Sequence, residues 1–380
     1  FFLYNDIVMK IGISGQKLLA DNPAGPEIYT YNIVSALARV DKENDYSVFF
    51  DRKVPEGYFE KLTGGNSRFS YKVLSSFPSW TQFHLAVQLL KTPVDVFFTP
   101  VHTMPIIRSK KLKVVGMIHG LEYLSNTKRK GSKVFSAAPI RFLAEHADHL
   151  IVPSEYTKNS LLETPWGVRG DKIGVIPEGV GHEFFKRDPL EGVLKGYGIE
   201  AGKYLLAIST IQPRKNYPRL IEAFSRISPD YPDFKLVICG KKGWEYDETF
   251  EAPQKYGISD KVLFPGRVPD EDLPFLLSGA VLFVSASLEE GFGLPLLEAM
   301  ACETSCVVSD LPSYKDIGQE SMIYFDPMNV EDIANGLSKA LNDLWVGEGI
   351  VRINMAKRRA LEFTWEKAAE RTLAVFKQLS

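Results

Sequence analysis

Hydrophobic and polar positions divide this chain into short β-branched and aromatic runs that alternate with longer amphipathic stretches. Short apolar runs are typical of strands, and longer runs with a 3.6-residue period are typical of helices. Their regular alternation predicts parallel βαβ units. In the first half we expect strands at residues 10–15, 46–50, 69–74, 94–99, 114–119, 149–153 and 173–176, and helices at 27–39, 81–90, 140–147 and 155–163.

A stretch rich in glycine and charge, residues 188–202, interrupts this pattern and is the expected interdomain linker. The alternation then restarts, which predicts a second unit of the same kind. The expected fold is therefore α/β, with two doubly wound Rossmann-like domains whose ligands bind outside the carboxyl ends of the parallel strands. In the second half we expect strands at residues 204–209, 235–239, 262–264, 281–285, 306–309 and 322–325.

The composition is that of an ordinary soluble globular protein, since 380 residues allow two sizeable cores and the net charge is only −2. Cys239, Cys302 and Cys306 lie in apolar runs without metal-ligand spacing, which favours buried thiols in a reducing compartment. No stretch approaches the roughly 20 apolar residues of a membrane-spanning helix. We therefore expect a cytoplasmic protein, and no nucleic-acid partner is expected.

Charge is unevenly distributed between the two halves. Residues 1–187 hold 24 basic and 18 acidic residues, whereas residues 188–380 hold 21 basic and 29 acidic ones. The basic half carries two clusters, at residues 108–113 and 128–133. These clusters are either solvated loops or sites of attraction to an anionic membrane surface, at the inner membrane face, or to a phosphate-bearing acceptor.

The most informative segment for function is residues 287–301, where an apolar strand gives way to a helical run. Two carboxylates, Glu290 and Glu298, flank a Gly-Phe-Gly turn that is followed by Pro295. Glycines allow close backbone approach, proline fits the first turn of a helix, and a helix N-terminus favours phosphate. Eight helical residues would separate the carboxylates by about 12 Å, beyond the roughly 5 to 9.5 Å of a glycosidase pair. The alternatives are one extended ligand bound at both ends, or two solvated glutamates on an ordinary amphipathic helix.

This segment resembles the E-x7-E signature of retaining glycosyltransferases of family 4, which have the two-domain GT-B fold. The resemblance implies that Glu290 lies by the donor sugar and Glu298 by the nucleotide ribose. It also implies that the last helix, residues 365–380, returns to the first domain. The expected domains are residues 9–187 with 365–380 on the acceptor side and residues 188–364 on the donor side. The turn between the two glutamates is expected to line the donor site with Gly291, Phe292, Gly293 and Leu294.

Arg214 and Lys215 follow the predicted strand 204–209 and precede a helix. They resemble the Arg-Lys-Asn segment of the same family, which implies that they bind the donor diphosphate. Two fixed positive charges suit a diphosphate that gains negative charge as it leaves. A plain basic loop is disfavoured because cations at a helix start oppose the dipole. One departure is Ser209, where the family usually has glycine.

His119 ends the predicted strand 114–119, and it resembles the family histidine that contacts the donor sugar. Gly120 stands where the family often has aspartate. Gly25, after the first strand, is the one match to a glycine-rich family loop that tracks the diphosphate or the acceptor. In the turn 177–180, Glu178 stands where the family has asparagine.

Three further residues are expected at the nucleotide base. Gly240 and the pair Arg267 and Val268 lie at strand ends of the second half. Arg267 and Val268 resemble the family segment whose backbone reads the base edge. After the signature helix, residues 303–306 replace the usual Gly-Thr-Pro-Val, and we expect a shifted turn there.

These patterns together favour a retaining, metal-independent glycosyltransferase with no tightly bound cofactor. Its donor is expected to be a GDP- or UDP-sugar, with a mannosyl donor favoured, and its acceptor a saccharide or glycolipid. A GT-B epimerase or phosphorylase and a catalytically silent nucleotide-sugar-binding protein are the alternatives. A nicotinamide dehydrogenase is disfavoured, because no Gly-x-Gly-x-x-Gly follows either domain's first strand.

Overall fold

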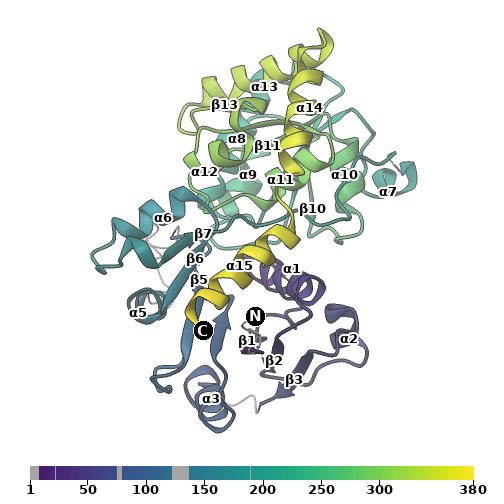
Figure 1. Ribbon diagram of the computed structural model, residues 1–380. Helices are drawn as coiled ribbons and strands as arrows, with labels where there is room; N and C mark the ends of the chain where they lie inside the picture. Colours follow the sequence, from purple (N-terminus) through teal and green to yellow (C-terminus); the bar gives the residue numbers. More distant parts are fainter. Residues whose placement is uncertain (1–7, 22, 75–78, 122–136, 189) are drawn as a thin grey trace. The chain divides into compact units, whose positions relative to one another are not determined.

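The computed structural model describes residues 8–21, 23–74, 79–121, 137–188 and 190–380 (Figure 1). The chain forms two compact units. The first comprises the chain up to Gly179 together with Thr364–Ser380, and the second comprises Val180–Phe363. The basic cluster 128–133 lies outside the described residues.

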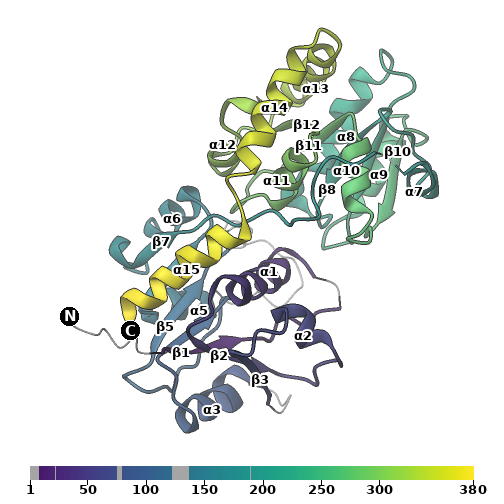
Figure 2. The ribbon, with the colours of Figure 1, turned by 45° about the vertical axis from the view of Figure 1, so that its right-hand side comes forward.

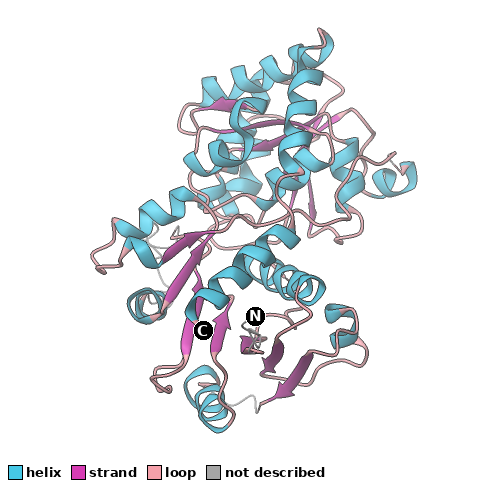
Figure 3. Cartoon of the chain, in the orientation of Figure 1, coloured by secondary structure: helices cyan, strands magenta, loops and turns pink. Residues whose placement is uncertain are grey.

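Among the described residues, the first unit contains a seven-stranded parallel sheet of order β3-β2-β1-β4-β5-β6-β7. Figure 3 draws the strands in magenta and the helices in cyan. Every residue of β4 is buried, as are all residues of β6 after His149. Such continuous apolar strands require cover on both faces of the sheet. The strands are β1 (Lys10–Ser14), β2 (Asp45–Phe50), β3 (Phe69–Val73), β4 (Val96–Thr99), β5 (Lys113–Met117), β6 (His149–Val152) and β7 (Ile173–Val175).

The helices of this unit include one that comes from the far end of the sequence. Helix α15 (Trp365–Leu379) runs beside α1 (Gly25–Val40) in Figures 1 and 2. Arg39 pairs with Glu366 at 2.8 Å, and the rings of Tyr29 and Trp365 meet edge to face. The first unit is therefore discontinuous in sequence. Its other helices are α2 (Tyr58–Thr63), η1 (Thr81–Leu85), α3 (Ala86–Lys91), α5 (Ala138–His146), α6 (Glu155–Leu162) and η2 (Gly170–Lys172).

The second unit repeats the architecture with a six-stranded parallel sheet, in its described residues, of order β10-β9-β8-β11-β12-β13. The order reverses between β8 and β11, and doubly wound sheets bind ligands at the carboxyl ends of the strands at such a switch point. The predicted α/β class with two Rossmann-like parallel sheets is thus confirmed. The strands are β8 (Tyr204–Ile208), β9 (Lys235–Cys239), β10 (Val262–Gly266), β11 (Leu282–Ser285), β12 (Ser305–Ser309) and β13 (Ile323–Phe325).

Helices flank this sheet along the chain, and the longest, α13, packs on α8. They are α7 (Glu191–Gly196), η3 (Pro213–Lys215), α8 (Tyr217–Ile227), α9 (Asp247–Lys255), α10 (Leu273–Gly279), α11 (Leu294–Ala301), α12 (Pro312–Gly318), η4 (Gln319–Ser321), α13 (Val330–Trp345) and α14 (Glu348–Ala360).

The stretch expected as a linker, residues 188–202, is instead part of the second unit. It forms the short helix α7, whose Leu194 is 1% exposed and lies against Gly279 of α10. Residues just before it are also tied to α10, because Lys186 Nζ and Arg187 N donate to Ser278. Although the segment is rich in glycine and charge, Leu194 and Ile199 are buried, and Gly202 N donates to Gly279 O of α10. In the described part of the chain, no helix is long and apolar enough to cross a bilayer.

Candidate active site

The signature segment forms a loop that connects β11 to α11. Glu290 lies in this loop, ahead of the first residue of α11, whereas Glu298 lies within the helix. The two carboxylates therefore do not share one helix, and the expected axial separation of about 12 Å does not apply. Pro295 occupies the first turn of α11, as predicted, and Gly293 precedes it with a φ of 134° that favours glycine.

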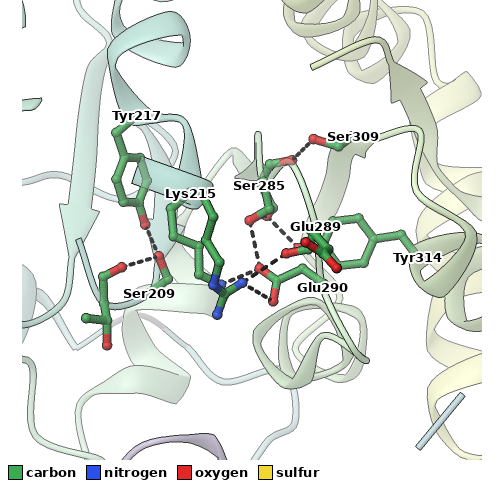
Figure 4. A network of polar contacts seen from close by, with 11 residues as sticks. Ser209, Lys215, Tyr217, Ser285, Glu289, Glu290, Ser309 and Tyr314 are labelled. Atoms are coloured by element: carbon green, nitrogen blue, oxygen red, sulfur yellow. Dashed lines mark hydrogen bonds and ion pairs between the residues drawn. The ribbon is translucent and has the colours of Figure 1, made fainter. Parts of the chain in front are cut away.

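Glu290 is the centre of a buried polar network that joins the ends of β8 and β11 (Figure 4). Its Oε2 accepts from Arg214 Nη1 at 2.9 Å. Its Oε1 accepts from Lys215 Nζ and from Ser287 Oγ, the latter at 2.7 Å. The side chains of Arg214 and Lys215 are 20% and 11% exposed, so both cations keep a small open side. The Glu290 carboxylate, which follows β11, thus binds two cations that follow the neighbouring strand β8.

The electrostatics of this network fix the charge of Glu290. Burial alone raises the pKa of the carboxyl. The charges of Arg214 and Lys215, with hydrogen bonds from Lys215 and Ser287, outweigh burial and lower the pKa to about 2. Glu290 is therefore an anion throughout the neutral range.

This depressed pKa predicts a specific pH dependence of stability. A carboxyl whose folded pKa lies below its ordinary value near 4.5 contributes stability above that value, and the contribution is lost as pH falls toward about 2. We expect Glu290→Gln to lower the free energy of unfolding most above pH 5, with the difference from wild type shrinking toward pH 2. Urea unfolding of both proteins from pH 7 to pH 3 measures it. A difference in unfolding free energy between the two proteins that stays constant over this pH range would contradict the lowered pKa of Glu290.

Arg214 and Lys215 are positioned by short-range backbone geometry. They end the 3-10 turn η3, and Asn216 follows in the left-handed region with a φ of 58°. Arg214 Nη1 also donates to Glu289 O, and Arg214 O accepts from Leu288 N at 2.8 Å. With its amide oxygen facing the guanidinium, Gln212 accepts from Arg214 Nε at 2.8 Å. The loop after β8 and the loop after β11 are therefore joined directly by these hydrogen bonds, in addition to their contacts through Glu290.

Hydroxyl groups that sequence reasoning missed support this network. Ser285 Oγ bonds to Tyr314 Oη at 2.7 Å and to Ser287 Oγ at 3.3 Å (Figure 4). Tyr314 also lies against Gly293, where an added Cβ would come within 2.7 Å of its ring. Ser209 bonds to Tyr217 Oη at 2.5 Å. The one available signal was the serine-rich end of β11, because small hydroxyls at a strand end commonly satisfy buried groups.

The residues expected at the base occupy different environments. Val268 is buried, whereas Arg267 lies at the surface and pairs with Asp270 at 3.5 Å. Gly240 has a φ of 153°, and a Cβ there would lie 1.7 Å from Ser209 O. The close backbone approach therefore occurs at Gly240, directly after β9, and it faces Ser209, the position where the family usually has glycine. The close contact with Ser209 O explains why residue 240 is glycine, whether or not a ligand binds there.

Gly240→Ala is expected to destabilise the second unit by about 2 to 4 kcal/mol, because the added methyl combines a strained φ with a backbone clash. Chemical denaturation measures the loss. Gly257→Ala is the matched control, since Gly257 also has a positive φ, of 70°, but a Cβ there meets nothing within 4 Å. Equal losses in the two variants would show that φ strain alone acts.

His119 and Gly25 belong to the first unit. His119 Nε2 lies within hydrogen-bond distance of Pro100 O, at 3.0 Å. The other ring nitrogen lies 3.4 Å from the buried Glu178 carboxylate, and Tyr29 meets the ring edge to face. Glu178, which replaces the family asparagine, thus orients the ring. A Cβ at Gly25, the first residue of α1, would meet nothing within 4 Å.

The other sequence-predicted residues of the signature segment lie in the loop before α11 and in α11 itself. Leu294 and Glu298 are both 8% exposed, and Phe292 is 5% exposed with its ring edge-on to Phe363. Gly291 follows Glu290 in the loop. The structure therefore brings Glu290, Arg214 and Lys215 into direct contact and holds the rest of the turn beside them.

Comparisons with known proteins agree with this architecture. Residues 23–184 match the model of Glycosyltransferase Family 4, and residues 195–356 match that of Glycosyl transferases group 1. O-antigen chain mannosyltransferase B of Escherichia coli is 29% identical over 241 residues, which are 62% of each chain. O-antigen chain mannosyltransferase RfbU of Salmonella typhimurium is 24% identical over 337 residues, 83% of this chain and 89% of that protein. This chain thus spans less than two thirds of the E. coli relative.

Solved structures show the same fold. HepE of Anabaena, in complex with UDP and glucose, superposes with a TM-score of 0.76 at 17% identity, covering 97% of this chain and 99% of that one. One family match covers most of each unit, with the first ending five residues past Gly179, and together they take in most of the sequence. The chain therefore belongs to the family 4 glycosyltransferases, with the two Rossmann-like domains of the GT-B fold.

Proposed function

We propose that this protein transfers a sugar from a nucleotide-diphosphate donor to a saccharide or glycolipid acceptor with retention of configuration. The observation that carries the proposal is the contact of Arg214 and Lys215 with Glu290 at the switch point of the second sheet. Doubly wound sheets bind nucleotides at such a point. In this role Glu298, Gly240 and Val268 contribute to the nucleotide site, and His119 and Gly25 to the sugar and acceptor side.

The charge balance suits a departing diphosphate. Two cations face one carboxylate, so the cluster keeps a net positive charge, and both cations retain an exposed side. Preorganised charges aimed at a developing anion are among the largest contributions to catalysis. Arg214 and Lys215 thereby stabilise the diphosphate as the bond to the sugar breaks.

The low pKa of Glu290 limits its chemical role. A carboxylate with a pKa of about 2 is a weak base at neutral pH. The acceptor proton is therefore taken by an oxygen of the leaving phosphate, while Glu290 holds the cations and offers negative charge to the electron-poor sugar carbon. No covalent sugar-enzyme intermediate is required.

The donor is proposed to be GDP-mannose. Both relatives described above carry the name mannosyltransferase, and both are named for O-antigen chains. The HepE structure holds UDP and glucose, so UDP-glucose is the competing donor.

Thermal unfolding in the presence of GDP-mannose, UDP-glucose, GDP and UDP tests the donor, because a ligand that binds the folded state raises the melting temperature. GDP-mannose is expected to give the largest shift, and incubation with mannose-terminated oligosaccharides should release GDP and form an α-linked product. A shift with UDP-glucose alone would replace the donor. Binding without any transfer or donor hydrolysis would overturn the activity.

A further inference from the structure

The outer face of the helix that precedes β4 is apolar where it meets solvent. Along η1 and α3, Phe83 is 64% exposed, Val87 37% and Leu90 48%. Their spacing of four and three residues puts them on one side of the helix. The opposite side, with Leu85 and Leu89, is buried in the core of the first unit. A surface helix normally shows polar residues to water, so this exposed stripe needs a partner.

The loop between β4 and β5 extends this stripe. Ile106 and Ile107 are 59% and 66% exposed. Gln82 fastens the loop to the helix, because its Nε2 donates to Met104 O at 3.0 Å and its Oε1 accepts from Ile106 N at 2.9 Å. The five exposed apolar residues on these two segments are called the docking face: Phe83, Val87, Leu90, Ile106 and Ile107.

Basic residues border the docking face. Residues 81–112 contain four basic residues and one acidic residue, Asp95. Lys91, Lys110 and Lys111 are exposed, whereas Arg108 donates to His146 O. Asp95 is engaged by the backbone N–H of Lys10. The border therefore presents exposed positive charge next to apolar side chains.

We propose that the docking face inserts its apolar side chains into an anionic lipid bilayer while Lys91, Lys110 and Lys111 bind the acidic headgroups. Apolar residues flanked by lysines are the combination that holds a peripheral protein at such a surface. The complementary charge favours acidic lipid over a second copy of this chain, whose docking face would carry the same positive charge. The proposal stands independently of which donor sugar the enzyme uses.

Sedimentation with vesicles tests the proposal on the chain of 380 residues. Binding is expected with vesicles of phosphatidylcholine and phosphatidylglycerol at low salt, and not with phosphatidylcholine alone. Replacing the three lysines by serine should weaken binding about a hundredfold, at roughly fivefold per basic residue. Phe83→Ser with Ile106→Ser and Ile107→Ser should weaken it by at least about a hundredfold, because the apolar side chains then lose their burial in the bilayer. Ile350→Ser with Val351→Ser, exposed to a similar extent on α14, is the matched control.

A position-specific probe separates insertion from mere attraction. Cys239, Cys302 and Cys306 are buried, and burial raises the pKa of each thiol, so an introduced surface cysteine can be labelled selectively. An environment-sensitive dye on Ile107→Cys should shift to the blue on adding acidic vesicles, whereas the same dye on Ile350→Cys should not. Absence of vesicle binding at low salt, equal shifts at both positions, or a dimer that only the docking-face variants dissociate would each overturn the proposal.

Discussion

Glu290→Gln is expected to lower kcat for sugar transfer by roughly 1,000-fold, about 4 kcal/mol, while the dissociation constant for the nucleoside diphosphate changes less than about threefold. Glutamine keeps the size and one acceptor oxygen of the side chain, yet it removes the negative charge that faces both Arg214 and Lys215. An interaction expressed mainly in the transition state lowers rate more than affinity. Initial rates at saturating donor and calorimetric titration with GDP measure the two quantities.

Glu331→Gln is the matched control for this substitution. Glu331 also pairs with an arginine in the second unit, Arg226 at 2.8 Å, but its side chain is 64% exposed. Exposed ion pairs contribute little, so both stability and turnover should stay close to wild type. Because Glu290→Gln also leaves two nearly buried cations without their counter-charge, its unfolding temperature must be measured and assays run well below it. Unchanged turnover in Glu290→Gln would remove this residue from the reaction.

Much of the architecture could be predicted from the sequence because strands and helices of this fold carry strong periodic signals. The second-half strand predictions lie within a residue or two of β8 to β13, since parallel strands are continuous apolar runs. The glycine turn and Pro295 likewise located the start of α11. Residues close together in the sequence determine the strand positions and the start of α11, so the local sequence pattern is enough to predict them.

The details of the site depend on contacts between distant residues, which no local pattern reports. The contact of Glu290 with Arg214 and Lys215 spans 75 or more positions in the sequence. Glu178 contacts His119, which lies 59 positions away in the sequence. The sequence alone shows Glu178 only as a replacement of the family asparagine. Gly240 is explained by a neighbouring strand rather than by its own sequence neighbours. The units divide at Gly179 rather than near residue 188, and Lys186, which lies between these positions, donates to Ser278 of α10, a contact between distant residues.

Arg214→Ala and Lys215→Ala are each expected to lower kcat/KM by roughly 100-fold or more, about 2.7 to 4 kcal/mol, the usual effect of losing one preorganised charge at a developing anion. In either variant the remaining cation still pairs with Glu290, so the loop should stay folded and the effect should fall on the reaction. Arg214→Lys should recover only part of the loss, because a lysine cannot reach Glu290, Glu289 O and Gln212 together as the guanidinium does.

The double variant separates charge stabilisation from binding. If both cations act on the same leaving diphosphate, the combined loss should differ from the sum of the two single losses, as expected for side chains in one network. The variants should also lose affinity for GDP more than for GMP, since the proposed role of the removed charges is to bind the second phosphate. Arg226→Ala, which removes an exposed arginine of the same unit, should leave both nucleotide affinities and turnover near wild type. Equal weakening of GDP and GMP binding, or turnover that requires added Mg²⁺ and vanishes in EDTA, would show that the charge of the leaving group is balanced elsewhere.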